Sequence, residues 1–222
     1  MKIGITERGD AGLDQSWRNA QVDGMILITK APHLISDVPE NAIIHCTITG
    51  YGGTKLEPGV AKPSITIQAA YKHLSTLGHK RTVLRVDPII PTDKGIEKAL
   101  SLIEGWPGRV RISFLDLYPH VIKRLSGIGW MLPWGTFNAP LEMRLEAYNE
   151  IKEICPQVEV CGEPDFPCTG CVSQLDLDAL GLKSDAAGLS HQRMACACLG
   201  LKTELLSNRR QCKHGCLYCY WK

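Results

Sequence analysis

Short runs of aliphatic and β-branched residues alternate along the first 160 residues with segments whose apolar residues recur at helical spacing. Consecutive parallel strands need a crossover connection, usually a helix, so this alternation predicts a mostly parallel sheet, open or barrel-shaped. We therefore expect an α/β fold over residues 1–160. The predicted strands cover residues 2–6, 24–29, 42–49, 81–86, 110–115 and 158–161, and the predicted helices cover residues 64–77, 94–104, 119–126 and 141–154.

Polar or charged side chains stand at the end of each predicted strand. In a parallel barrel these ends lie on one face, which is where active sites occur. Strand ends are also where chains ordinarily become polar, so the argument rests on all six ends together. They carry Glu7 and Arg8, Lys30, Thr47 and Thr49, Arg85 and Asp87, Asp116, and Cys161 with Glu163.

Ten cysteines are distributed very unevenly, because Cys46 alone lies in the first 154 residues. The first ten residues contain no export signal, so we expect a cytoplasmic protein, and disulfides are rare there. Clustered cysteines in that setting are typical of metal or iron–sulfur sites, or of catalytic thiols. Residues 161–222 are therefore predicted to form a loop-rich, cysteine-rich segment that binds a cluster and packs on the barrel mouth.

Charge and hydropathy exclude several classes of protein. Lys and Arg number 25 against 23 Asp and Glu, which argues against a strongly basic nucleic-acid coat. No apolar run approaches the roughly 20 residues of a membrane helix, so we expect no membrane association. Residues 202–222 nevertheless carry five cations and one acid. A basic end of this kind can favour a reduced cluster, bind phosphate groups including those of nucleic acid, or simply be solvated.

The chain ends in QCKHGCLYCYWK, in which Cys212, Cys216 and Cys219 form C-x3-C-x2-C. Three thiolates on one short loop can each hold one iron of a 4Fe-4S cluster and leave the fourth iron open for chemistry. We call these three cysteines the terminal triad. Zinc is the alternative, with His214 or another cysteine as fourth ligand.

The spacing C-x3-C-x-aromatic-C, with Tyr218 as the aromatic residue, resembles the signature of radical S-adenosylmethionine (radical SAM) enzymes. The resemblance implies a full or partial (β/α) barrel, SAM bound to the open iron, and an electron donor such as flavodoxin or ferredoxin. It also implies hydrogen abstraction from a substrate that the sequence does not identify. In that superfamily the motif usually lies near the start of the barrel, so its terminal position here would be a permuted arrangement.

A closer resemblance, to a bacterial family of unknown function, covers most of the chain. It rests on residues 47–60 (TITGYGGTKLEPGV), 85–90 (RVDPII), 113–118 (SFLDLY), 161–163 (CGE), 196–198 (CAC) and 213–220 (KHGCLYCY). The family's SRRTDIP-like string is only TERGD here, at residues 6–10, and an expected Asn-Pro after Thr-Lys is Ala31-Pro32. These departures concern the first two strand ends.

The same resemblance implies a second metal site on Cys161, Cys171, Cys196 and Cys198, which we call the second group. It would hold a second iron–sulfur cluster or zinc, and Cys168 could replace one of its ligands.

The usual SAM-contact motifs of the radical SAM superfamily cannot be placed by position here, so the candidate SAM contacts are taken from the glycine-rich loop, the polar strand ends and the triad loop. They are Gly50, Gly52, Gly53, Arg85, Asp87, Asp116, Glu163 and Tyr218. A plain turn is the alternative for the glycines, and an internal salt bridge is the alternative for Arg85 with Asp87. A different class of function also fits the sequence, namely a non-enzymatic iron–sulfur or zinc protein that binds a partner or nucleic acid.

Overall fold

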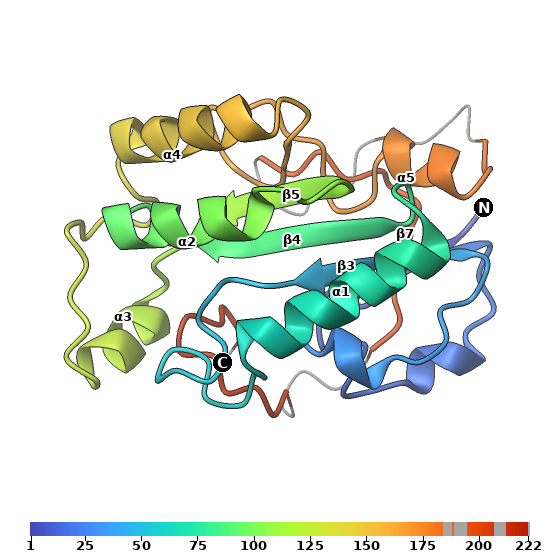
Figure 1. The fold of residues 1–222 in the computed structure, drawn as a ribbon, viewed down its shortest axis with the longest axis horizontal. Coiled ribbons are helices and arrows are strands. Elements are labelled where there is room, and N and C mark those ends of the chain that lie inside the picture. Colours follow the sequence, from blue (N-terminus) through green and yellow to red (C-terminus); the bar gives the residue numbers. More distant parts are fainter. Residues whose placement is uncertain (184–187, 189–194, 207–211, 222) are drawn as a thin grey trace.

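The computed structural model describes residues 1–183, 188, 195–206 and 212–221. Seven parallel strands form one curled, half-barrel sheet in the order β6-β5-β4-β3-β2-β1-β7 (Figure 1). The strands are β1 (Ile3–Ile5), β2 (Gly24–Thr29), β3 (Ala42–Thr47), β4 (Thr82–Ile89), β5 (Arg109–Phe114), β6 (Glu159–Val160) and β7 (Lys202–Glu204). This confirms the predicted α/β partial barrel of parallel strands.

The helices follow the predicted pattern closely. They are α1 (Pro63–Leu77), α2 (Asp93–Ile103), α3 (Pro119–Ser126), α4 (Leu141–Ile154) and α5 (Gln174–Ala179), with short 3-10 turns at Ser16–Asn19 and Pro32–Leu34. Proline occupies the first turn of α1 and of α3, where its missing N–H removes no helical hydrogen bond. In the described part of the chain, no helix is both long and apolar enough to cross a membrane.

The convex face of the sheet is covered by α1, α2 and α4. Leu84 and Val110 from the sheet pack there with Ala70 of α1, Ile96 of α2 and Ile151 of α4. β2 and β3 are buried along their whole length, which explains their nearly continuous apolar sequences.

The concave face is covered by the cysteine-rich segment. Cys171, Val172, Leu177 and Cys198 pack on inward-facing residues of β1 to β4, among them Ile26. This segment is largely loop, as expected, but it also contributes α5 and the edge strand β7. The triplet Lys202–Glu204 pairs in parallel with Ile3–Ile5 of β1. A three-residue strand with two charged residues carries no alternation that a sequence pattern could detect.

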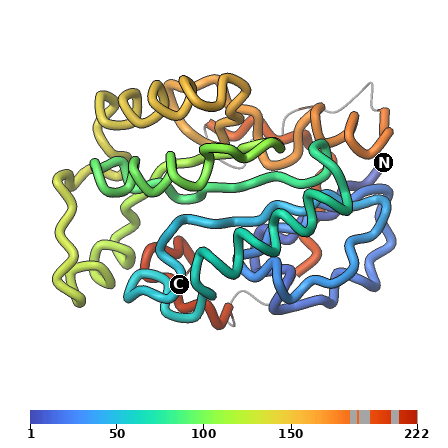
Figure 2. Tube along the Cα trace, viewed as in Figure 1, coloured from blue at the N-terminus to red at the C-terminus, as the bar shows by residue number. Residues whose placement is uncertain are grey.

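The chain termini lie at opposite ends of the sheet (Figure 1). The end of the chain lies at the carboxyl ends of the strands, beside the loop that joins β3 to α1 (Figure 2). The terminal triad is thereby placed where a parallel barrel has its active site.

Candidate functional site

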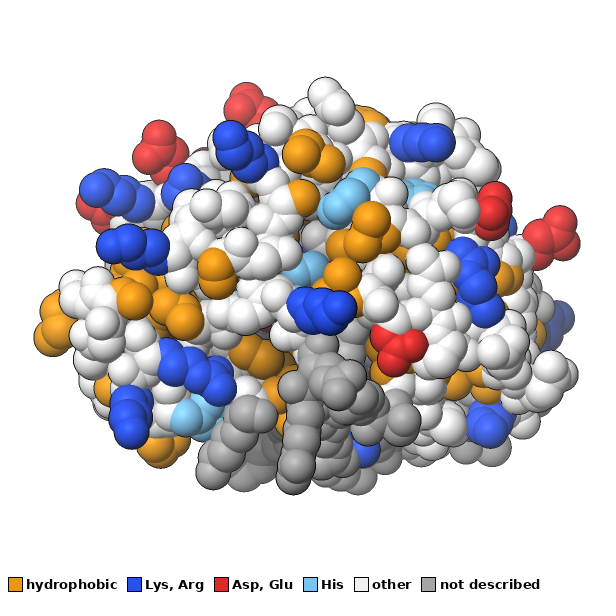
Figure 3. Space-filling model, turned by 90° about the horizontal axis from the view of Figure 1, so that it is seen from below, with side chains coloured by type: hydrophobic (Ala, Val, Ile, Leu, Met, Phe, Trp, Pro, Cys, Tyr) orange, Lys and Arg blue, Asp and Glu red, His pale blue; other side chains and the backbone are white. Residues whose placement is uncertain are grey.

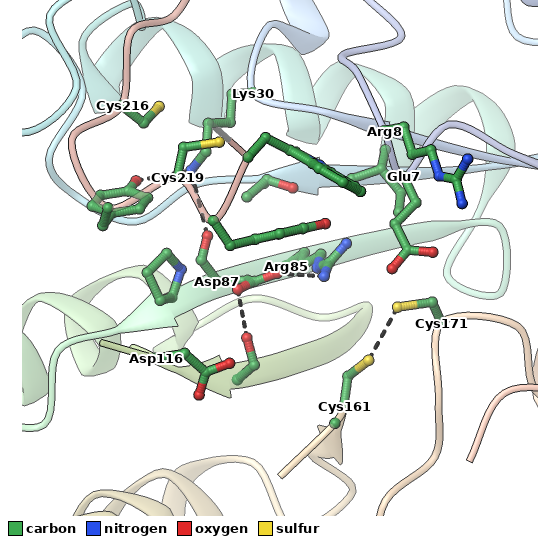
Figure 4. Close-up of a pocket in the computed structure, with 18 of the residues that line it drawn as sticks. Glu7, Arg8, Lys30, Arg85, Asp87, Asp116, Cys161, Cys171, Cys216 and Cys219 are labelled. Atoms are coloured by element: carbon green, nitrogen blue, oxygen red, sulfur yellow. Dashed lines mark hydrogen bonds and ion pairs between the residues drawn. The ribbon is translucent and has the colours of Figure 1, made fainter. Parts of the chain in front are cut away.

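A cavity of about 490 Å³ opens at the carboxyl ends of the strands. Its volume is within the range of roughly 300–1,000 Å³ that is typical of small-molecule sites. All seven predicted metal ligands line it, as do Arg85, Asp87, Asp116, Glu163 and Tyr218. Figure 4 shows Cys216 and Cys219 on one side, Cys161 and Cys171 on another, and Arg85 with Asp87 between them. The two cysteine groups therefore face one shared space.

The three predicted glycines are placed elsewhere: Gly50, Gly52 and Gly53 are not among the described residues that line this cavity. A Cβ on Gly52 would lie 2.1 Å from the carbonyl oxygen of Ala61, so the close approach of the loop to itself accounts for this glycine. The local fold thus gives Gly52 a role in the turn.

The terminal triad is held to the rest of the molecule by a buried ion pair. His214 Nε2 lies 2.8 Å from Asp10 Oδ2, and His214 Nδ1 lies 3.1 Å from the carbonyl oxygen of Gly59. Asp10 also accepts hydrogen bonds from Thr29 Oγ1 and the backbone N–H of Lys30. Both ring nitrogens of His214 face acceptors, so both donate and the ring is an imidazolium.

Burial opposes the charge of each partner in this pair, and their mutual attraction overcomes it. The hydrogen bond and charge of His214 hold the pKa of Asp10 below its ordinary value, although burial alone would raise it. The same contacts raise the pKa of His214 against the effect of burial. Because both nitrogens of His214 are engaged, this residue does not provide the fourth zinc ligand considered from the sequence.

Two further contacts fix the triad loop. Gly59 N–H donates to the carbonyl oxygen of His214, and Leu217 N–H donates to that of Leu56. A Cβ on Gly59 would meet the carbonyl oxygen of Lys213 at 2.3 Å, so only glycine permits this approach. On the other side, Arg124 of α3 donates to the carbonyl oxygen of Cys219 at 2.8 Å.

Two thiols of the triad, Cys216 and Cys212, lie in a setting that disfavours their free thiolates. Burial raises the pKa of Cys216 to about 12, and the charge of Lys30 acts against this. Burial likewise raises the pKa of Cys212. Lys30 at the end of β2 forms an ion pair with Glu57 at 2.7 Å and donates to the hydroxyl of Tyr218 at 3.0 Å. A bound metal cation would stabilise the deprotonated thiols, with proton release on binding.

Within the described residues, no set of three or more His, Cys, Asp or Glu side chains converges on a point where one metal ion could bind. A cubane cluster does not require such convergence, because each cysteine binds a different iron. The donor set of the triad, three thiols on one loop at the cavity wall, thus suits a cluster better than a single ion.

The second group is assembled from three separate stretches of chain. Cys161 follows β6, and its Sγ lies 3.0 Å from Sγ of Cys171. The backbone N–H of Cys171 donates to Sγ of Cys198 at 3.0 Å, and Cys196 is half-buried at the cavity wall. Cys168 instead exchanges hydrogen bonds with the backbone of Glu163 and is absent from the described cavity lining.

Buried cations surround the second group. Hydrogen bonds from the thiols of Cys161 and Cys198 hold the pKa of Cys171 well below its ordinary value, and the charges of Arg85 and Arg111 act in the same direction. Arg111 is fully buried, donates to the carbonyl oxygen of Cys171 at 3.1 Å and pairs with Glu159. This environment favours a thiolate at Cys171, the form that binds metals, while the hydrogen bonds to Cys171 raise the pKa of Cys161 and of Cys198.

Acidic groups occupy the cavity floor at the ends of β4, β5 and β6. Asp87 is paired with Arg85, so the internal salt bridge considered from the sequence is present, and both residues still line the cavity. Asp116 accepts a hydrogen bond from Asn138 at 2.9 Å. Burial raises the pKa of Glu163 to about 8. Glu163 is therefore largely protonated at neutral pH.

Several important residues were not predicted from the sequence, namely Asp10, Glu57, Arg111 and His45. Asp10 pairs with a residue 204 positions away, and no local pattern signals such a partner. Arg111 lies inside a predicted strand, where a buried charge signals a partner without identifying it.

Among the described residues, the face drawn in Figure 3 shows no single dense basic patch. Lys and Arg side chains are scattered over that face, and Asp and Glu lie among them. A dense basic stripe is what a phosphate backbone would require.

A family model for a domain of unknown function, DUF1848, matches residues 13–221. The match spans most of the 222 residues, so the chain belongs to the DUF1848 family. This confirms the predicted membership of a family of unknown function. No curated protein and no solved structure matches the chain.

Proposed function

We propose that this member of the DUF1848 family is a radical SAM-like enzyme with a 4Fe-4S cluster on Cys212, Cys216 and Cys219. The observation that carries the proposal is the position of the triad. Three cysteines at C-x3-C-x2-C spacing line a cavity of about 490 Å³ at the carboxyl ends of a parallel half-barrel. A cluster bound by three cysteines has one open iron, and the cavity gives a ligand access to it.

The chemistry that such a cluster supplies when bound is one-electron cleavage of SAM to methionine and a 5′-deoxyadenosyl radical, which abstracts hydrogen from a substrate. The electron would come from a reduced flavodoxin or ferredoxin, and Cys212 is the exposed member of the triad. The permuted position of the motif is compatible with this arrangement. The triad follows β7, and β7 is an edge strand beside β1.

The protein's own residues hold the ligand in this proposal. Arg85 and Asp87 present one positive and one negative group to the cavity, which suits the zwitterionic amino-acid part of SAM. Glu163 is protonated at neutral pH and can donate a hydrogen bond to a ligand oxygen. Tyr218 is fixed by Lys30, so its ring is oriented before a ligand arrives. Asp116 lines the same cavity beside these residues.

The second group would hold a second iron–sulfur cluster or zinc at the opposite cavity wall. Four thiolates with a divalent metal, or with a 4Fe-4S core of charge +2, carry a net charge of −2. The buried cations Arg85 and Arg111 offset that charge. Because no three described side chains of this group converge on a position for one metal ion, a cluster fits the second group better than zinc.

The experiment is anaerobic reconstitution with iron and sulfide, followed by reduction with dithionite in the presence of SAM. We expect thiolate-to-iron absorption in the visible range, and equal yields of methionine and 5′-deoxyadenosine. Cys155→Ala is the matched control, because Cys155 ends α4 and is not among the described residues lining the cavity. A reconstituted protein that contains zinc alone and forms no 5′-deoxyadenosine would contradict the proposal.

A further inference from the structure

Exposed apolar side chains are concentrated in residues 117–141, which run from just after β5 to the first residue of α4. We call these residues the α3 segment, because α3 and the loop after it make up most of it. In the described part of the chain, thirteen large hydrophobic side chains are exposed, and five of them belong to this segment. They are Ile122, Trp130, Met131, Phe137 and Leu141. Single exposed apolar residues are ordinary, but a group of them in one segment marks an interaction surface.

The charges of the α3 segment all have one sign. The segment lies between Asp116 and Glu142 and contains no acidic residue, whereas it carries Lys123 and Arg124. Lys98 of α2 adds a cation at its border, because its Nζ lies 5.5 Å from the ring centre of Tyr51, against which Trp130 packs. Protein interfaces are enriched in Trp, Phe, Met and Arg and depleted of Asp and Glu. A charged partner that this surface recognises is therefore acidic.

The inner side of the α3 segment packs on the triad loop. Trp134 belongs to the buried cluster that contains Tyr218, and Cys216 packs against this cluster. Arg124 of α3 donates a hydrogen bond to the carbonyl oxygen of Cys219. The exposed apolar side chains thus lie on a segment whose buried side contacts the terminal triad.

Aromatic contacts connect the outer surface with the end of the triad. The ring of Phe137, which is 47% exposed, meets the ring of Tyr118 edge-on at 4.9 Å between centroids. The ring of Tyr118 lies 6.3 Å from that of Tyr220, the residue after Cys219. A protein docked on Phe137 would therefore be separated from the triad loop by these few side chains, and a short separation is what electron transfer between proteins requires.

We propose that the α3 segment is the docking surface for an acidic flavoprotein that donates one electron to the triad site. The inference rests on the proposed function, which requires such a donor. In the transfer, an anionic flavin hydroquinone loses one electron and becomes the neutral semiquinone, the oxidised cluster gains that electron, and no covalent bond is made or broken. Electron-transfer complexes have small interfaces, so a compact patch is sufficient.

Direct binding tests the surface separately from SAM cleavage. The probe is oxidised flavodoxin, an acidic flavoprotein, which is titrated by calorimetry at low salt into the full chain purified anaerobically. Met131 is 81% exposed and Lys123 is also exposed, so Met131→Glu and Lys123→Glu should leave folding intact. We expect each substitution to weaken binding by about tenfold, because it places a negative charge opposite an acidic partner.

Matched controls come from α5 and α4, which are well separated from α3 in Figure 1. Leu175→Glu corresponds to Met131→Glu, and Lys152→Glu corresponds to Lys123→Glu, because both side chains are exposed. Absence of binding to the wild-type chain, or equal weakening by control and test variants, would overturn the inference. A dimer of the chain in sedimentation that Met131→Glu converts to a monomer would identify a second copy as the occupant and would overturn it as well.

The choice of electron donor gives a second comparison. Dithionite is a small ion that needs no docking surface, so 5′-deoxyadenosine formation with dithionite should be the same in the wild type and in both variants. With reduced flavodoxin below saturation, we expect the rate to be about tenfold lower in the variants, and the wild-type rate to fall as salt is raised. Absence of 5′-deoxyadenosine with dithionite in the wild type would contradict the proposed function. Flavodoxin-driven rates that neither substitution changes would overturn the docking surface alone.

Discussion

The two cysteine groups share one cavity and differ in how the chain builds them. The terminal triad lies within eight residues, and its loop is held by an ion pair between His214 and Asp10. The second group comes from the end of β6 and two loops that cover the concave face. The terminal triad is therefore a local sequence motif, whereas the cysteines of the second group come together only when the sheet has formed.

The electrostatic settings of the two groups also differ. Burial raises the pKa of Cys216, and the charge of Lys30, which is paired with Glu57, acts against this. The pKa of Cys171 is lowered by hydrogen bonds from Cys161 and Cys198, with Arg85 and Arg111 contributing, while the pKa of Cys161 and of Cys198 is raised. The second group therefore favours one thiolate, at Cys171, before any metal binds, and a bound metal would stabilise further thiolates in both groups.

Separate cysteine replacements give the largest expected effects, because they test whether the triad alone is needed for SAM cleavage while the second group holds a separate metal. Cys216→Ala should reduce 5′-deoxyadenosine formation to the background given by dithionite alone, because one iron of the open cluster loses its ligand. Cys171→Ala should remove the metal of the second group and still permit reductive cleavage of SAM. The measurement is 5′-deoxyadenosine by chromatography, with iron and zinc determined per chain.

If Cys171→Ala abolished 5′-deoxyadenosine as completely as Cys216→Ala while the triad cluster stayed intact, the division of roles would be wrong. Cys46→Ala, deep in the convex-face core, controls for loss of a buried thiol at a position outside both groups.

The next largest effect concerns the charge beneath the second group. Arg111→Met leaves Glu159 and Asp176 without their fully buried partner, so we expect a loss of about 3–5 kcal/mol in the free energy of unfolding. Arg109 binds the same two carboxylates from a partly exposed position. Arg109→Met should therefore be less damaging. Urea unfolding of the metal-free chain measures both, and equal losses would contradict the special position of Arg111.

The contrast between a local motif and a group assembled by the fold also explains which features could be predicted from the sequence. Strands, helices and the triad are local patterns, so the half-barrel and the cysteine loop were predictable from apolar periodicity and from C-x3-C-x2-C. Polar strand ends also indicated the cavity, because parallel strands bring such ends together. Arg85 and Asp87 were identified in this way.

Long-range pairing was not predictable, for physical reasons. Asp10 and His214 are 204 residues apart, and their contact depends on the curvature of the whole sheet. β7 pairs with β1 through three residues, of which two are charged. The strand is therefore defined by its pairing with β1 and not by a pattern in its own sequence. His45 lies in an apolar run, where sequence alone cannot distinguish a paired histidine from an unpaired one.

The smallest predicted effect concerns pH and the anchoring of the triad loop. The pKa of His214 is raised above 6.5, so its contribution to stability is fully present below pH 6.5 and is lost as pH rises through the raised value. The pKa of Asp10 is lowered from 3.8, so its contribution is present above pH 3.8 and is lost as pH falls through the lowered value. Together they predict a maximal contribution of the pair between pH 3.8 and 6.5.

His214→Gln provides the comparison, because glutamine keeps a hydrogen-bond donor and does not titrate in this range. In the metal-free, reduced chain, the difference in unfolding free energy between wild type and His214→Gln should be largest near pH 6 and should shrink as the pH rises. The free thiols titrate in both proteins, so their effect largely cancels in the difference.

Asp14→Asn is the control, because the Asp14 carboxylate accepts a hydrogen bond from the backbone N–H of Ser16 near the surface, and it should leave the pH profile unchanged. A difference that stayed constant from pH 6 to the alkaline limit of folding would show that the pair is not ionised. The triad loop would then be anchored to Asp10 by a hydrogen bond between uncharged groups, together with its backbone contacts to Leu56 and Gly59 and the bond from Arg124 to Cys219.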